Sequence, residues 1–196
     1  AWTNLYASLY LLLPASILSL VFMLVIIFNK KMISYLAPLY AISQGITMGM
    51  FSYYFNTLYE GIAITAISYT FCILFGLLSI YRLGLIKATE NFKLGVGAAT
   101  SGIFLLYVIN FAMSFFGTGI PLMDINNSSM ASIGFSVFVI IIAAMNLVVD
   151  FDFIEEGAEK GAPKYMEWYG AFGLMVTLIW LYLEILKLLA KMNSRK

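Results

Sequence analysis

The chain has 196 residues, of which 62% are hydrophobic and only 11% are charged, and its formal net charge at pH 7 is +1. Soluble domains carry about 25% charged residues, so this composition excludes a water-soluble globular protein and predicts an all-α, polytopic bundle of transmembrane helices. The small net charge gives no support for a nucleic-acid partner, and the absence of histidine removes the commonest general base and metal ligand.

Six apolar stretches are long enough to be membrane-spanning helices, because about 20 helical residues cross a bilayer core of about 30 Å. In chain order they cover residues 5–28, 33–55, 61–81, 94–116, 130–149 and 169–189. The second stretch is the most polar, and its Gln44 should face other helices, since hydrocarbon cannot satisfy an amide. We therefore expect one transmembrane domain over residues 1–196, embedded in a lipid bilayer and monomeric by default.

Small residues mark candidate helix contacts. Gly45 and Gly49 have the small-x-x-x-small spacing that lets two helix backbones approach closely, and Ala98 and Gly102 repeat it. Each pair is a candidate site of close packing.

Basic residues predict the orientation in the membrane. The loops after the first, third and fifth spans hold Lys30, Lys31, Arg82, Lys87, Lys93, Lys160 and Lys164, and the other two loops hold none. By the positive-inside rule, these three loops are cytoplasmic. The C-terminal tail opposes this assignment, because Lys191, Arg195 and Lys196 would then lie outside.

Acidic residues concentrate near the last two spans. Seven of the ten lie between Asp150 and Glu184: Asp150, Asp152, Glu155, Glu156, Glu159, Glu167 and Glu184. Asp150 and Asp152 follow the fifth span, and Asn146 shares a helix face with Asp150 because the two are four residues apart. Glu167 begins the sixth span, so a hairpin should bring Asp150, Asp152 and Glu167 to one membrane depth.

Carboxylates crowded at a partly desolvated site resist ionisation together, because like charges and low polarity both raise their pKa. The sequence therefore predicts a proton-sensitive gate or a cation site at Asp150 and Asp152, which are also candidate transient calcium ligands. The alternative is a set of solvated acids beside Lys160 and Lys164.

Glu184 and Arg82 are expected to have roles different from those of the Asp150 group. Glu184 lies 17 residues after Glu167, about 25 Å along a helix, and Lys187 is close enough to pair with it. An acid inside a membrane span is a functional candidate. Arg82 ends the third span and is expected to anchor the topology.

Four blocks of the sequence form a recognisable pattern: APLYA at 37–41, YRLGLIK at 81–87, NLVVDFDFIE at 146–155 and GAPKYMEWY at 161–169. This pattern resembles the YccA-like branch of the Bax inhibitor family, the transmembrane Bax-inhibitor-motif proteins. The likeness extends from about residue 37 to residue 191. It implies a seven-helix fold with a central last helix, located in a bacterial inner membrane or a plasma membrane. Against six spans here, we expect an N-terminal first helix to be missing from this chain.

The resemblance also implies a calcium leak controlled by pH, with no cofactor. In the family, two aspartates on the last two helices and an arginine close the pore. Asp150 or Asp152 matches the first aspartate. Glu184 in a Leu-Tyr-Leu-Glu block is the nearest match to the second, although an ungapped alignment places Met175 there. Gln44 stands where the family often has a glutamate.

The leading hypothesis is a pH-sensitive calcium leak channel whose gate or ion site uses Asp150, Asp152, Glu184 and Glu167. Three polar residues would support it: Asn146, Arg82 and Gln44. The alternative is a membrane regulator that binds and modulates a membrane-bound quality-control protease, as within this family branch. An enzyme is not expected, because Ser136 lacks the following glycine and the histidine of a rhomboid site.

Overall fold

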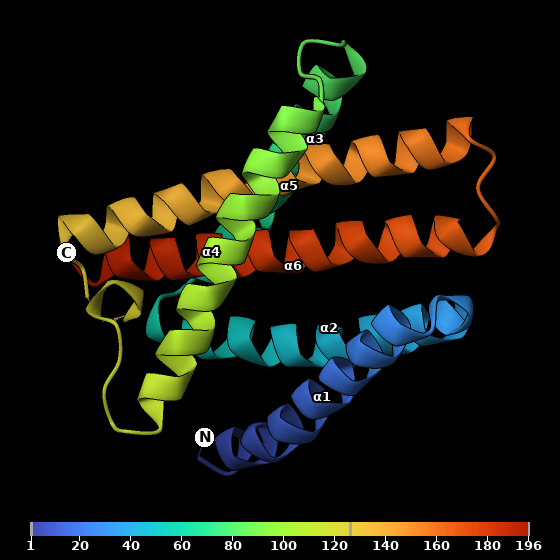
Figure 1. The fold of residues 1–196 in the computed structure, drawn as a ribbon. Helices are drawn as coiled ribbons and strands as arrows, with labels where there is room; N and C mark the ends of the chain where they lie inside the picture. Colours follow the sequence, from blue (N-terminus) through green and yellow to red (C-terminus); the bar gives the residue numbers. More distant parts are fainter. Residues whose placement is uncertain (1, 126, 196) are drawn as a thin grey trace.

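The computed structural model describes residues 2–125 and 127–195, with side chains from residue 12 onward. Within these residues the chain forms six long α-helices (Figure 1). They are α1 (Trp2–Phe28), α2 (Ile33–Leu58), α3 (Ile62–Arg82), α4 (Glu90–Ser114), α5 (Met130–Glu159) and α6 (Tyr165–Asn193). Two 3-10 helices, η1 (Lys30–Met32) and η2 (Pro121–Met123), lie in the connections before α2 and α5.

The helices confirm the predicted all-α membrane bundle. Each predicted span is helical, and among the described residues α3, α4, α5 and α6 are long and apolar enough to cross a membrane. The described part of α1 adds a shorter apolar stretch, Leu12–Phe28. Large apolar side chains such as Phe75 and Phe104 are exposed on the outside of the bundle. Such side chains suit contact with lipid.

Helix α6 is the centre of the bundle. In Figure 1 it lies between α5 and α2, while α4 crosses in front of it and α1 lies beside α2. Its Leu181 and Leu186 are fully buried in a core that includes Phe55 of α2, Ala66 of α3 and Leu147 of α5. Neighbours on several sides require α6 to be apolar around most of its circumference.

Helix α5 extends ten residues beyond the predicted span and ends at Glu159. Asp150 and Asp152 are therefore helical residues, where the sequence predicted the start of a loop. The helix stops at Gly161, whose φ of 61° is left-handed, and the Ala162 amide donates to the Gly157 carbonyl at 2.9 Å. This is the hydrogen bonding of a glycine-terminated helix. Glutamate and alanine favour the helical extension before it.

Among the glycines, the tightest contact with another helix occurs at Gly170 and not at Gly45, Gly49 or Gly102. A Cβ added to Gly170 would lie 2.7 Å from Cγ1 of Ile154 on α5, whereas one added to Gly45, Gly49 or Gly102 would have no atom within 4 Å. The α5–α6 hairpin thus depends on the missing side chain of Gly170.

We expect Gly170→Ala to separate α5 from α6 and to destabilise the protein by about 1–3 kcal/mol, because the added methyl overlaps Ile154. Thermal unfolding in detergent measures the effect. Gly95→Ala is the matched control, since its methyl would enter open space in α4. Combining Gly170→Ala with Ile154→Ala should recover part of the lost stability. Equal unfolding temperatures for the two glycine variants would contradict this account.

Candidate functional site

The side chain of Asp150 on α5 lies in the contact between α5 and α6. One carboxylate oxygen, Oδ1, lies 3.7 Å from the position of a Cβ on Gly173, and the Thr177 hydroxyl is its polar neighbour. The other oxygen, Oδ2, is shielded from solvent and has no hydrogen-bond partner. Among the described residues, no lysine or arginine forms an ion pair with this carboxylate. A carboxylate oxygen that is shielded from solvent and has no partner makes ionisation of the group energetically costly.

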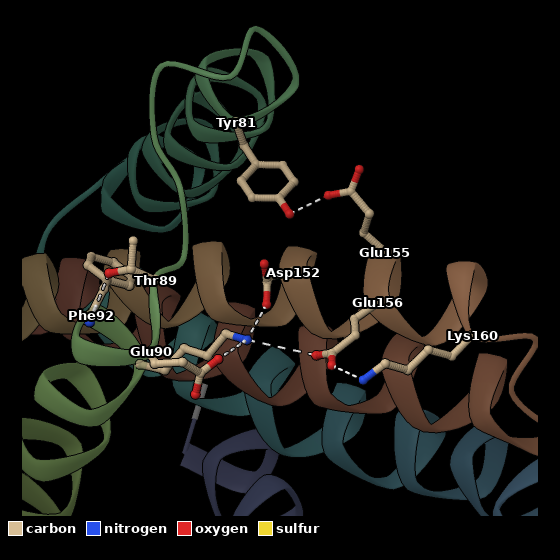
Figure 2. Close-up of polar contacts among 9 residues, drawn as sticks. Tyr81, Thr89, Glu90, Phe92, Asp152, Glu155, Glu156 and Lys160 are labelled. Carbon is tan, nitrogen blue, oxygen red and sulfur yellow. Dashed lines mark hydrogen bonds and ion pairs between the residues drawn. The ribbon is translucent and has the colours of Figure 1, made fainter.

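Asp152 faces a different helix. Its Oδ2 lies 2.6 Å from Nζ of Lys93 at the start of α4, and this ammonium also lies 3.3 Å from Glu90 and 3.8 Å from Glu156 (Figure 2). Glu156 in turn pairs with Lys160 one turn later in α5. Lys93 therefore neutralises several carboxylates and links α4 to α5.

Tyr81 connects α3 to the C-terminal part of α5, where Asp152 and Glu156 also lie. Its hydroxyl donates to Glu155 (Figure 2). Its ring packs against Phe151 with 5.8 Å between the centroids. We call this group the Lys93 cluster; it consists of Tyr81, Glu90, Lys93, Asp152, Glu155, Glu156 and Lys160. Three helices meet in it, so a change of charge here acts on α3, α4 and α5 together.

The supporting residues predicted from the sequence are dispersed. The amide of Asn146 donates to the Thr100 hydroxyl on α4 at 2.8 Å and to the Ile142 carbonyl at 2.9 Å. Arg82 is exposed at the end of α3, and Gln44 is half-buried on α2. Glu167 is exposed at the start of α6. It lies closer to the turn between α5 and α6 than Gly173, the α6 residue that faces Asp150. The hairpin therefore does not place Asp150 and Glu167 at one depth.

Glu184 forms a separate polar site. Its side chain is 3% exposed, and Oε1 accepts hydrogen bonds from the Tyr107 hydroxyl at 2.6 Å and from Lys187 Nζ at 2.9 Å. The predicted pairing with Lys187 is confirmed. Glu184 lies seven residues, about 10 Å, beyond Thr177 along α6. It is therefore not the carboxyl partner of Asp150.

The other candidate for the second family aspartate also lies elsewhere. Met175 packs in a cluster with Tyr40 of α2 and Phe172 of α6. The group beside Asp150 is the hydroxyl of Thr177, so this chain has one carboxylate where the resemblance implied a pair.

The described residues contain no group of three or more histidine, cysteine, aspartate or glutamate side chains arranged to hold a metal ion. Asp150 points to α6 and Asp152 to α4. A calcium ion bound by both would require one side chain to leave its present neighbour.

Lys191 is a buried residue that the sequence placed in the C-terminal tail. Its side chain is 2% exposed, and Nζ donates to the carbonyls of Leu122 at 3.0 Å and Ser132 at 3.4 Å and to the Ser136 hydroxyl at 3.0 Å. These hydrogen bonds connect η2 and the start of α5 to the end of α6. Lys191 is therefore a buried residue of α6 and not part of an exposed tail.

The family comparison supports the resemblance to the Bax inhibitor family and does not specify the YccA-like branch. Residues 1–194 match the family model described as Bax inhibitor 1 like. No curated protein and no solved structure matches the chain significantly. The match covers the whole Lys93 cluster as well as Asp150, Glu184 and Lys191.

We expect the charge reversal Lys93→Glu to lower the unfolding temperature, because it places a further negative charge among the carboxylates that Lys93 neutralises. The double exchange with Asp152→Lys should recover much of the loss. High salt should weaken both effects, since ions screen partly exposed charges. Lys160→Glu is the control: its side chain is 71% exposed, so its reversal should change the temperature little. A double exchange no more stable than Lys93→Glu would refute the bridging role.

Proposed function

From the premise that this chain belongs to the Bax inhibitor 1-like family, we propose that it is a pH-sensitive calcium leak channel. Asp150 is its proton-sensitive gate, and Asp152 lies beside the gate within the Lys93 cluster. The observation that carries the proposal is the half-buried carboxylate of Asp150, whose Oδ2 is shielded from solvent and has no hydrogen-bond partner.

The charge on Asp150 controls how well α5 and α6 fit together. A neutral carboxyl group is tolerated among apolar neighbours, whereas an ionised one attracts water or a cation. Protonation therefore favours the closed contact beside Gly173 and Thr177. Loss of the proton loosens the contact and creates a negative site for Ca²⁺, whose preferred ligands are oxygens. The leak accordingly increases as pH rises.

The Lys93 cluster supports the gate from the other side of α5. Its Lys93–Asp152 ion pair sits two residues from Asp150 and joins α4 to the helix that carries the gate. Asp152 has the Lys93 ammonium beside it, whereas Asp150 has no cation as a partner among the described residues. Asp152 thus sets the position of the gate, and Asp150 responds to protons.

The basic residues support a cytoplasmic location for this end of the bundle. Lys93 and Lys160 lie in the Lys93 cluster, and Lys30 lies over the Tyr169 ring at 5.3 Å from its centroid. With Lys191 buried, fewer basic residues remain at the opposite end. The proposed protein is an integral multi-pass monomer without a cofactor, and calcium is its permeant ion.

A regulatory role remains the second candidate, on a different observation. Gly45 and Gly49 line a cavity of about 570 Å³ between α2, α3 and α6 and have no atom within 4 Å of an added Cβ. Small residues at this spacing suit the apolar helix of a partner, such as a membrane-bound quality-control protease. Co-purification of a protease with the protein in mild detergent tests this role.

We expect calcium efflux from liposomes containing the purified full chain to increase between about pH 6 and pH 8, where a buried carboxyl group releases its proton. Asp150→Asn imitates the protonated side chain, so its efflux should stay low at all pH values. Asp152→Asn should change the rate but keep the pH response. Calcium-sensitive dye in the external buffer measures all three.

Glu159→Gln is the matched control, because Glu159 is an exposed acid on the same helix and its variant should follow the wild-type profile. A wild-type pH profile in Asp150→Asn would exclude Asp150 as the gate. Efflux equal to that of empty liposomes at every pH would exclude a channel and favour the protease-binding role.

A further inference from the structure

Two cavities adjoin along α6. The membrane cavity, of about 570 Å³, lies between α2, α3 and α6 and contacts α6 from Ala171 to Tyr182. The turn cavity, of about 810 Å³, lies where α5 ends and α6 begins, and it contacts α6 from Met166 to Leu174. Both cavities are lined by Ala171 and Leu174, so they meet at this point of the helix. Together they suit a ligand that is apolar at one end and polar at the other.

The membrane cavity offers a ligand almost no hydrogen bonds. Its hydroxyl groups already have partners: Ser52 bonds the Tyr182 hydroxyl at 2.6 Å, and Thr70 donates to the Ala66 carbonyl at 2.8 Å. The other side chains that line it are apolar. Apolar cavities exclude water and accept apolar molecules. Hydrocarbon is therefore the chemistry that fits the membrane cavity.

The membrane cavity is open toward the lipid. Ile67 and Phe71 of α3, which line it, are 44% and 50% exposed, and Gly45 and Gly49 of α2 are exposed as well. Along α6 the cavity covers residues 171–182, an advance of about 16 Å. This length is close to half of a hydrocarbon core of about 30 Å. The membrane cavity therefore matches the acyl-chain region of one leaflet.

The turn cavity lies at the level of the lipid head groups. Trp168 in the first turn of α6 is 41% exposed, and an exposed tryptophan at the end of a membrane helix is typical of the interface. Three charged side chains line the turn cavity: Glu156, Lys160 and Glu167. Lys160 pairs with Glu156 but stays 71% exposed, so its ammonium group has room for a phosphate. Glu167 is exposed and forms no ion pair among the described residues.

These charges match a zwitterionic head group that carries a phosphate and a primary amine. The phosphate would lie at Lys160, and the ammonium group would donate charge-assisted hydrogen bonds to Glu167. A choline head group has no N–H to donate. An anionic head group without a cation would lie beside Glu156 and Glu167, whose charges repel it. Charge complementarity therefore favours ethanolamine.

We propose that the two cavities bind one phosphatidylethanolamine molecule, with its head group in the turn cavity and an acyl chain in the membrane cavity. Glu167 selects the head group, and Gly49 leaves room for the chain. Neither Asp150 nor Asp152 lines either cavity, so the inference stands apart from the proposed leak. It gives the membrane cavity to a lipid, where the second candidate function gives it to a partner helix.

Lipid retention by the purified full chain tests the site. The protein is incubated in mixed detergent micelles with equal amounts of phosphatidylethanolamine, phosphatidylcholine and phosphatidylglycerol that share the same acyl chains. Native mass spectrometry then counts the lipid that stays bound. We expect one phosphatidylethanolamine per chain, retained severalfold more than the other two lipids. Glu167→Gln should remove this preference, because an amide does not neutralise the ammonium group. Gly49→Leu should lower the retention of all three lipids severalfold, since its side chain enters the membrane cavity.

Glu159→Gln and Gly95→Leu are the matched controls and should retain lipid like the wild type. Glu159 is an exposed acid near the same turn, Gly95 faces open space on α4, and neither lines a cavity. Glu167→Gln changes an exposed side chain, so its result does not depend on the folding of Gly49→Leu. 

Equal retention of the three lipids by the wild type, or an unchanged preference in Glu167→Gln, would overturn the head-group site. Wild-type retention by a folded Gly49→Leu protein would overturn the chain site. If that variant also lost a co-purifying protease, the membrane cavity would belong to the partner helix.

Discussion

The structure depends on one constraint: the polar groups of the central helix must be satisfied inside the bundle, because lipid offers them no hydrogen bonds. Glu184 and Lys191 are almost completely buried on α6. Glu184 is satisfied by Tyr107 of α4 and by Lys187, and Lys191 by the connection before α5 and by the first turns of α5. These requirements bring α4, α5 and η2 against α6. Burial of apolar side chains alone would not specify that arrangement in a membrane, where lipid is as apolar as the helix surfaces.

The two ends of the α5–α6 pair differ in their electrostatics. At one end the Lys93 cluster is half exposed, and its charges are shared among several partners that salt can screen. At the other end Lys191 is enclosed and makes its contacts mainly with backbone carbonyls, so salt affects it little. Asp150 lies near the adaptable end and has the unsatisfied oxygen. The proposed gate would respond to protons at this end, while the contacts of Lys191 at the opposite end keep the helices in register.

Several features of the site followed from the sequence because they depend on local spacing. The positions of the six helices, the pairing of Glu184 with Lys187 and the family could all be read from short segments. The end of α5 could not be read from the sequence, because apolar content marks the membrane boundary and not the end of the helix. Charged residues continue α5 to Glu159, and the chain turns at Gly161. The close contact was expected at Gly45 and Gly49 but occurs at Gly170, since small-residue spacing shows where helices can approach and not whether a partner is present.

By itself, the sequence determined that this protein is a helical membrane bundle of the Bax inhibitor type, since hydrophobic runs and short motifs are properties of contiguous residues. Only the tertiary structure decided which polar residues meet. It placed Thr177, and neither Glu184 nor Met175, beside Asp150, and it turned Lys191 from a tail charge into a buried anchor. Spacing defines a helix face, whereas the neighbour of that face depends on how all the helices pack around α6.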